Sequence, residues 1–131
     1  KSILLAACAR SQGIPSRLGY ANVRNHLSTE KLRKLMRTDV FVFHGYTELY
    51  LQGSWVKATP VFNLSLCERF GVVPLEFDGR NDSIFHDYDT LGNRHMEYLY
   101  DYGQFADLPF QLMVSEFSRY YPHMFGEEGN M

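Results

Sequence analysis

A run of twelve residues at 40–51, VFVFHGYTELYL, restricts the possible folds more than any other segment. β-Branched and aromatic residues dominate it, and such runs form strands. A tight turn at 52–54 follows, and residues 55–58 return as a second short strand, so we predict an antiparallel β-hairpin. Because helices are expected at separate places along the chain, the hairpin favours an α+β fold with an antiparallel sheet over a doubly wound fold.

The remaining pattern predicts an alternation of short elements. Residues 2–10 have apolar side chains at helical spacing, and Gly13 and Pro15 after them are typical of a helix end. Ser28 is the expected cap of a short basic helix that reaches residue 36. Residues 79–93 are expected to be loop, and the tail at 126–131 is expected to fray. We predict further strands at 17–23, 72–77 and 95–102, and a last helix at 109–121 that buries Phe110, Met113, Val114 and Phe117.

The composition is that of one globular domain. The chain has 131 residues, of which 45% are hydrophobic and 21% charged, and we expect a single domain over 1–131. No apolar run approaches about 18 residues, so we expect no membrane span. The net charge of −2 argues against nucleic acid as a partner.

The charges are nevertheless unevenly distributed. Residues 1–66 hold nine Lys and Arg against three Asp and Glu, whereas residues 67–131 hold four against twelve. We expect the two halves to pack together and partly neutralise each other, with a polar partner docked on one half as the alternative.

The first residues and the cysteines indicate whether the domain is complete and in which cellular compartment we expect the protein. Lys1 lies within an apolar helical pattern, without an initiator Met, a cap or a signal peptide, so we expect the domain to lack its N-terminal part. Cys8 and Cys67 are too few for a disulfide framework, and two free thiols are typical of a reducing compartment, so we expect a cytoplasmic location.

Successive side chains of a strand point to opposite faces, so His44 and Glu48 share one mixed face of the long strand, with Tyr46 between them. The opposite face, with Phe41 and Phe43, is the expected core. A histidine can act as a general base because its ordinary pKa lies near neutrality. A single strand histidine is more commonly structural, so the residues alone leave both roles open.

Three segments, in order, resemble the transglutaminase-like superfamily of papain-related cysteine enzymes. LLAACARSQGIPSRLGY resembles its helix and Gly-Ile-Pro-Ala/Ser-Arg motif, and HGYTELYLQGSWVKATP resembles its His-x-Trp-x-Glu-x-Tyr strand, Gly-x-Trp turn and Asp-Pro end. The stretch from FGVVPLEFDGRNDSIFHDYD to RHMEYLYDYGQFADLPF is similar to a bacterial branch of the superfamily. The resemblance implies a papain-like core, with an N-terminal helix packed on an antiparallel sheet and a C-terminal strand–loop–helix extension.

The resemblance also implies a Cys–His–Asp triad, in which His44 matches the histidine. The superfamily's cysteine lies fifteen residues before the glycine of its Gly-Ile-Pro motif, which corresponds to three positions before Lys1. Thr59 stands at the aspartate position. A threonine hydroxyl can accept a hydrogen bond from an imidazole but has no charge to stabilise an imidazolium. Asn63 is a second candidate for orienting the ring.

Other polar residues are weaker candidates for the site. Tyr46 takes the superfamily's tryptophan position and is expected to contact the substrate. Glu48 is expected to pair with an arginine such as Arg17 rather than to take part in catalysis. A polar stretch before the basic helix either lines a cleft and binds substrate or is a simple helix-entry loop; it consists of Arg24, Asn25 and His26.

Neither cysteine is a good nucleophile by position, and no cofactor is indicated. Cys8 is expected to be buried inside the first helix, and Cys67 is expected to be a packed thiol. His86 and His95 lie among acidic residues, but their spacing matches no dense metal motif. We expect no metal and no calcium loop.

The resemblance implies thiol-dependent acyl transfer on amide or peptide bonds of a peptide or protein substrate. Either hydrolysis or transamidation is open, and hydrolysis is more common among bacterial members of the superfamily. A non-catalytic binding or scaffold domain is the alternative, because Thr59 replaces the aspartate. An acidic interaction surface around Asp87 and Asp89 is a third possibility. The oligomeric state does not follow from the sequence.

Overall fold

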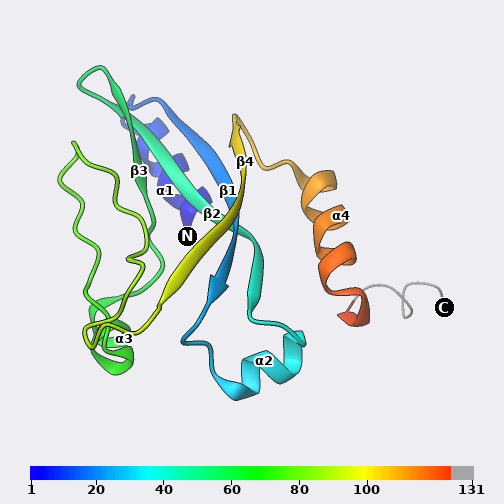
Figure 1. The fold of residues 1–131 in the computed structure, drawn as a ribbon. Helices are drawn as coiled ribbons and strands as arrows, with labels where there is room; N and C mark the ends of the chain where they lie inside the picture. The colour runs from blue at the N-terminus through cyan, green and yellow to red at the C-terminus, as the bar shows by residue number, and fades with distance from the viewer. Residues whose placement is uncertain (125–131) are drawn as a thin grey trace.

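A four-stranded antiparallel sheet is the centre of the computed structural model, which describes residues 1–124 (Figure 1). The strand order is β3–β2–β1–β4. The predicted tail at 126–131 lies outside the described residues. The strands are β1 (Ser16–Asn25), β2 (Val40–Leu51), β3 (Ser54–Ala58) and β4 (Met96–Phe105).

The hairpin forms as predicted. β2 pairs with β3 from Thr47 opposite Ala58 to Leu51 opposite Ser54, and the turn between them places Gln52 and Gly53 at positive φ. On the other side of β2 lies β1, which also pairs with β4. The predicted strands at 17–23 and 95–102 therefore become β1 and β4, each somewhat longer than expected.

Within residues 1–121, four helices accompany the sheet, and one of them was not predicted. The helices are α1 (Ser2–Ser11), α2 (Glu30–Met36), α3 (Leu64–Phe70) and α4 (Phe110–Tyr120). Thr29, rather than Ser28, caps α2, because its hydroxyl accepts a hydrogen bond from the Leu32 N–H. Helix α3 occupies a segment for which no helix was predicted. The strand predicted at 72–77 is wrong, because that segment has no regular structure.

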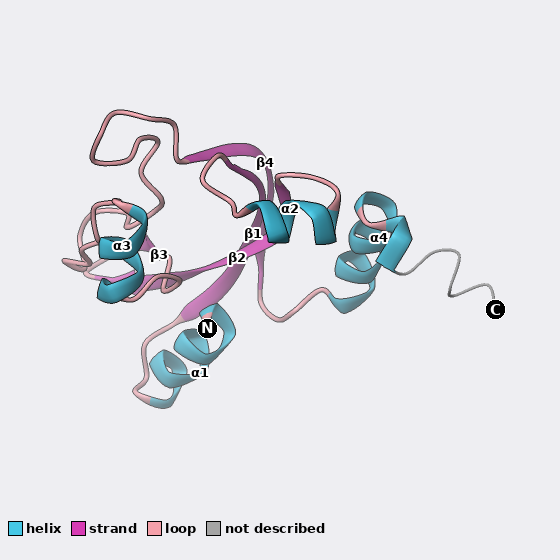
Figure 2. Cartoon of the chain, turned by 90° about the horizontal axis from the view of Figure 1, so that it is seen from below, coloured by secondary structure: helices cyan, strands magenta, loops and turns pink. Residues whose placement is uncertain are grey.

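Two apolar clusters hold the elements together. The first joins Ala6 of α1 to Leu18 and Tyr20 of β1, and Phe117 and Tyr121 at the end of α4 pack into it. In the second cluster, Phe85 and other residues of the long connection between β3 and β4 pack on the sheet, against Ala21, Val23 and Tyr46. Figure 2 shows α3 beside β3 and α4 at the other end of the sheet.

A local irregularity changes the predicted faces of β2. Phe43 has a φ of 59°, and its N–H donates to Asn22 Oδ1 of β1. This irregularity interrupts the alternation, so Val42 and Phe43 are both buried in the first cluster. The mixed face is also buried at Tyr46, which packs with Phe85 of the long connection, and at Glu48, which pairs with Arg17.

Two predictions about helix faces are wrong. Cys8 is exposed, since α1 buries only Ala6 and Ala9 against the sheet. In α4, Phe110 and Val114 are exposed, whereas Met113 and Phe117 pack against the first cluster together with Tyr121. No helix within residues 1–124 has the length and hydropathy required to cross a membrane.

The oppositely charged halves of the chain do meet. Arg24 lies 3.4 Å from Glu97 across the β1–β4 pairing, and Lys57 Nζ lies 3.9 Å from Asp101. The expected mutual neutralisation of the two halves is therefore confirmed at the sheet.

Candidate active site

His44 lies in the middle of β2, next to the irregularity at Phe43. Its ring lies against Phe85, with the centroids 4.9 Å apart. Nε2 is shielded from solvent and has no hydrogen-bond partner among residues 1–124. Burial lowers the pKa of His44 from 6.5 to about 4, so the ring is neutral at pH 7. A neutral imidazole can accept a proton.

One side of His44 opens toward the first turn of α1. His44 and Gly45 line a cleft of about 340 Å³ together with Lys1, Ser2 and Ile3. Hydrogen bonds fix this junction: Ser2 Oγ donates to the Gly45 carbonyl at 2.9 Å, and Thr47 Oγ1 donates to the Ser2 carbonyl at 2.7 Å. The N-terminal end of α1 is thus held beside the imidazole.

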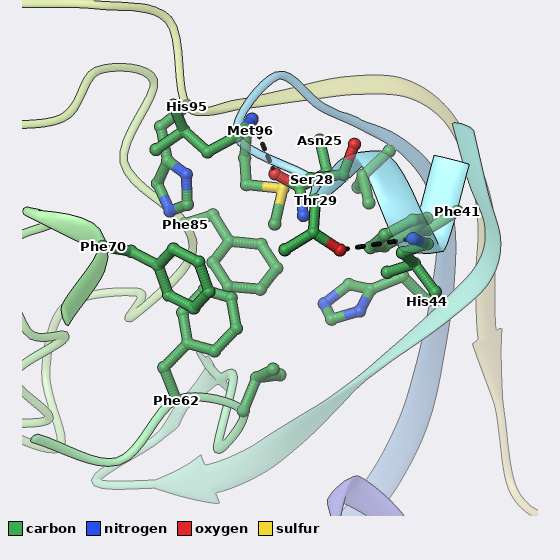
Figure 3. A pocket seen from close by; sticks show the side chains of 14 residues that line it. Asn25, Ser28, Thr29, Phe41, His44, Phe62, Phe70, Phe85, His95 and Met96 are labelled. Carbon is green, nitrogen blue, oxygen red and sulfur yellow. Dashed lines mark hydrogen bonds between the residues drawn. The ribbon is translucent and has the colours of Figure 1, made fainter. Parts of the chain in front are cut away.

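A second cavity, of about 190 Å³, lies on another side of His44 (Figure 3). Phe62, Phe70 and Phe85 form much of its wall and separate His44 from His95 in this view. The long connection between β3 and β4 supplies these rings, and β1 and α2 supply the opposite wall. His44 is therefore shared between a cleft and an apolar cavity.

Thr59 follows β3 and is buried. It lines a separate hollow with Leu5 and Pro60, and its buried hydroxyl has no hydrogen-bond partner among the described residues. Thr59 does not line either of the two cavities that contain His44. Asn63, the second candidate for orienting the ring, caps α3 instead, because its Oδ1 accepts from the Leu66 N–H at 2.9 Å.

The three polar candidates at the end of β1 have different surroundings. Asn25 lines the 190 Å³ cavity, and its Oδ1 accepts from the Leu27 N–H at 3.0 Å. Arg24 pairs with Asp39 at 3.3 Å and with Glu97 at 3.4 Å, and His26 Nε2 lies 3.7 Å from Glu97. Of the three, the structure brings only Asn25 to the cavity beside His44.

Tyr46 is only 2% exposed, and its ring lies over Gly19 of β1. Its hydroxyl contacts the Asp101 carboxylate at 3.0 Å and accepts from Gln104 at 3.2 Å. Burial and the Asp101 charge raise the pKa of Tyr46. These contacts attach β2 to β4. The expected contact of Tyr46 with a substrate remains a prediction.

Glu48 forms the structural ion pair expected from the sequence. The carboxylate is buried and lies 3.3 Å from Arg17 Nε, and Arg17 also stacks on Trp55, with its guanidinium 4.0 Å from the ring centroid. The prediction that Glu48 pairs with Arg17 is confirmed.

Sequence analysis missed two polar residues of the apolar cavity. Ser28 and His95 line it, at 7% and 3% exposure, and neither Ser28 Oγ nor His95 Nδ1 has a hydrogen-bond partner among the residues described. Burial lowers the pKa of His95. The sequence marks His95 only as a candidate metal ligand and Ser28 only as a helix cap. No local motif marks either residue, because the cavity exists only once the long connection folds back.

Metal-ligating and thiol side chains were the remaining candidates from the sequence. Within residues 1–124, no group of three or more His, Cys, Asp or Glu side chains is placed to hold a metal ion. Cys67 is a buried thiol on α3, as expected.

Part of the chain matches the model of a known protein family. The model of the transglutaminase-like superfamily matches residues 1–60. This segment is similar to the transglutaminase-like superfamily. It contains α1, the β1–β2–β3 part of the sheet, His44 and Thr59, whereas β4 and α4 lie beyond it. No curated protein and no solved structure gives a significant match. The α+β architecture, with an N-terminal helix on an antiparallel sheet, is consistent with a transglutaminase-like core.

Proposed function

We propose that this transglutaminase-like segment provides the histidine of a site for thiol-dependent acyl transfer on amide or peptide bonds. The observation that carries the proposal is the cleft in which His44 faces the first turn of α1. By resemblance to the superfamily motif, the thiol is expected three positions before Lys1, adjacent to that turn. A thiol there would lie near the positive end of the helix dipole, which favours the thiolate.

The proposed reaction begins with proton transfer from the thiol to His44. The thiolate sulfur attacks the amide carbonyl and forms a C–S bond. His44 then gives its proton to the amine nitrogen as the C–N bond breaks. Water or a second amine attacks the thioester, His44 accepts the proton of this nucleophile, and the proton returns to the thiol as the C–S bond breaks. Hydrolysis and transamidation differ only in that nucleophile.

A binding or scaffold role is the second candidate, and Thr59 is the observation that favours it. Thr59 lies outside both cavities of His44. A carboxylate at this position would stabilise an imidazolium, which a hydroxyl cannot do.

Thiol alkylation followed by intact mass distinguishes the two functions. We would use the chain extended by about twenty native residues upstream, with Cys8→Ser, because Cys8 is exposed. The proposal expects one upstream thiol that reacts rapidly at neutral pH and slows at least about tenfold in His44→Ala, as for loss of an activating base. His86→Ala is the matched control, because His86 is exposed and does not line the cleft. Absence of a fast thiol, or a rate indifferent to His44, would favour the binding role.

A further inference from the structure

The 190 Å³ cavity beside His44 has a lining that selects its occupant. We infer that it takes an uncharged aromatic side chain of the substrate, next to the bond that the thiol attacks. This inference rests on the proposed function and names the substrate class of the same site. The size of the cavity, its rings, its lack of charge and its unpaired polar atoms support it separately.

The volume suits a single ring. An engineered protein cavity of about 150 Å³ binds benzene, so a space of about 190 Å³ accommodates a benzene ring with a small substituent. The walls suit a ring as well. Phe62 and Phe85 lie with centroids 5.5 Å apart and planes inclined by 43°, and Phe41 and Phe70 also line the space. Aromatic side chains favour such tilted contacts with a further ring.

The lining excludes charged side chains. It contains no Lys, Arg, Asp or Glu, and its two titratable residues, His44 and His95, both have pKa values lowered by burial. A carboxylate or ammonium group in this cavity would lose its hydration without gaining a counter-ion. The cavity therefore discriminates against acidic and basic side chains.

Two buried polar atoms give the cavity a preference among aromatic groups. Ser28 Oγ and His95 Nδ1 lack partners among residues 1–124, and an unpaired buried polar group costs free energy. A hydroxyl group on the bound ring can both donate and accept a hydrogen bond. A phenolic ring should therefore bind more tightly than a plain one.

Binding of small ring compounds tests the inference without any catalysis. The probes are toluene, 4-methylphenol, 4-methylbenzoate and 4-methylbenzylammonium, titrated into the 131-residue protein. The readout is the ¹³C-methyl resonances of methionine, because Met96 lines the cavity, whereas Met36 and Met113 pack on the first apolar cluster. We expect 4-methylphenol to shift the Met96 signal saturably, to bind several-fold more tightly than toluene, and to bind at least tenfold more tightly than either charged probe.

Two variants on one helix locate the binding site. Leu32→Phe adds bulk to the cavity wall and should weaken binding of 4-methylphenol at least tenfold, whereas Leu35→Phe, at an exposed position of α2 outside the cavity, should leave it unchanged. Ser28→Ala should reduce the preference for 4-methylphenol over toluene. Thermal unfolding of each variant checks that the fold is retained.

Three results would overturn the inference: no uncharged probe shifts Met96 at millimolar concentration, the charged probes bind equally well, or a folded Leu32→Phe binds as tightly as the Leu35→Phe control. These results are separate from the alkylation experiment. If the cavity binds aromatic probes selectively but no thiol reacts in a His44-dependent way, the proposed reaction is wrong and the inference about the cavity stands. If a thiol reacts rapidly but no aromatic probe binds, the inference about the cavity is wrong and the proposed reaction stands.

Discussion

The His44 imidazole lies against the Phe85 ring, with their planes inclined by 35°. The contact joins the β2 strand of the transglutaminase-like segment to the long connection that follows residue 60. The same ring of Phe85 closes the apolar cavity. The protonation of His44 and the shape of the cavity therefore depend on one packing contact.

The buried histidine should make stability depend on pH. The pKa of His44 is about 4 in the folded chain and 6.5 ordinarily, so the unfolded chain binds more protons between these values. The free energy of unfolding should fall as the pH drops from 6.5 to 4, by at most about 3 kcal/mol from His44. Urea unfolding of the protein and of His44→Gln at pH 7.5, 6, 5 and 4.5 measures this contribution. His95 adds a fall of the same sign in both proteins, so parallel pH curves would contradict the prediction.

The close contact of Gly19 with Tyr46 should make Gly19→Ala destabilising. A β-carbon at Gly19 would overlap the Tyr46 ring, and overpacking of this kind costs about 1–3 kcal/mol. In a Tyr46→Leu background the same change should cost less, because the ring is absent. Chemical unfolding of the four proteins of this double-mutant cycle measures the coupling. Purely additive effects would show that the overlap is relieved elsewhere.

Replacement of Thr59 by aspartate tests the position that the superfamily motif assigns to it. If the side chain reaches the imidazole, Thr59→Asp should raise the pKa of His44 above about 4, because a nearby carboxylate favours the imidazolium. Thr59→Asn is the matched neutral control. NMR titration of the His44 ring protons gives both pKa values. Equal values in the two variants would remove residue 59 from the surroundings of His44.

The two cysteines should differ strongly in native reactivity. Cys8 is exposed on α1, whereas Cys67 is 3% exposed on α3. Cys67 can react only after local opening, and an opening free energy of about 3 kcal/mol slows a reaction roughly a hundredfold. Peptide mass spectrometry after timed alkylation measures both rates. Comparable rates in the folded protein would mean that α3 opens almost freely.

Local sequence predicted those elements whose signals are local. The bounds of β2 agree with the predicted Val40–Leu51, because twelve strand-forming residues end at a two-residue turn. Helix α3 was missed although its ends carry ordinary signals: Asn63 is the N-cap, and Gly71 adopts a φ of 66° at the other end. Those capping residues mark a helix that exists, whereas the apolar residues of 72–77 led to the prediction of a strand that does not form.

The site was less accessible to sequence reasoning, because it depends on long-range packing. The motif located His44, and the ion pair of Arg17 with Glu48 followed from charge and burial. The lowered pKa of His44 and the unpaired atoms of Ser28 and His95 follow from the covering connection. Its path over the sheet is not encoded by any periodicity in residues 60–95.

The position of β1 between β2 and β4 has a consequence for folding. Residues 1–60 carry the superfamily pattern, yet the second edge of β1 is paired by β4, which follows far later in the chain. Alone, those sixty residues would leave the backbone of a buried strand unpaired, an edge that invites intermolecular association. The β2–β3 hairpin can close early, while the β1–β4 pairing requires a large loop to close first and is expected to be slow. The smallest unit that folds is therefore longer than the unit that sequence comparison recognises.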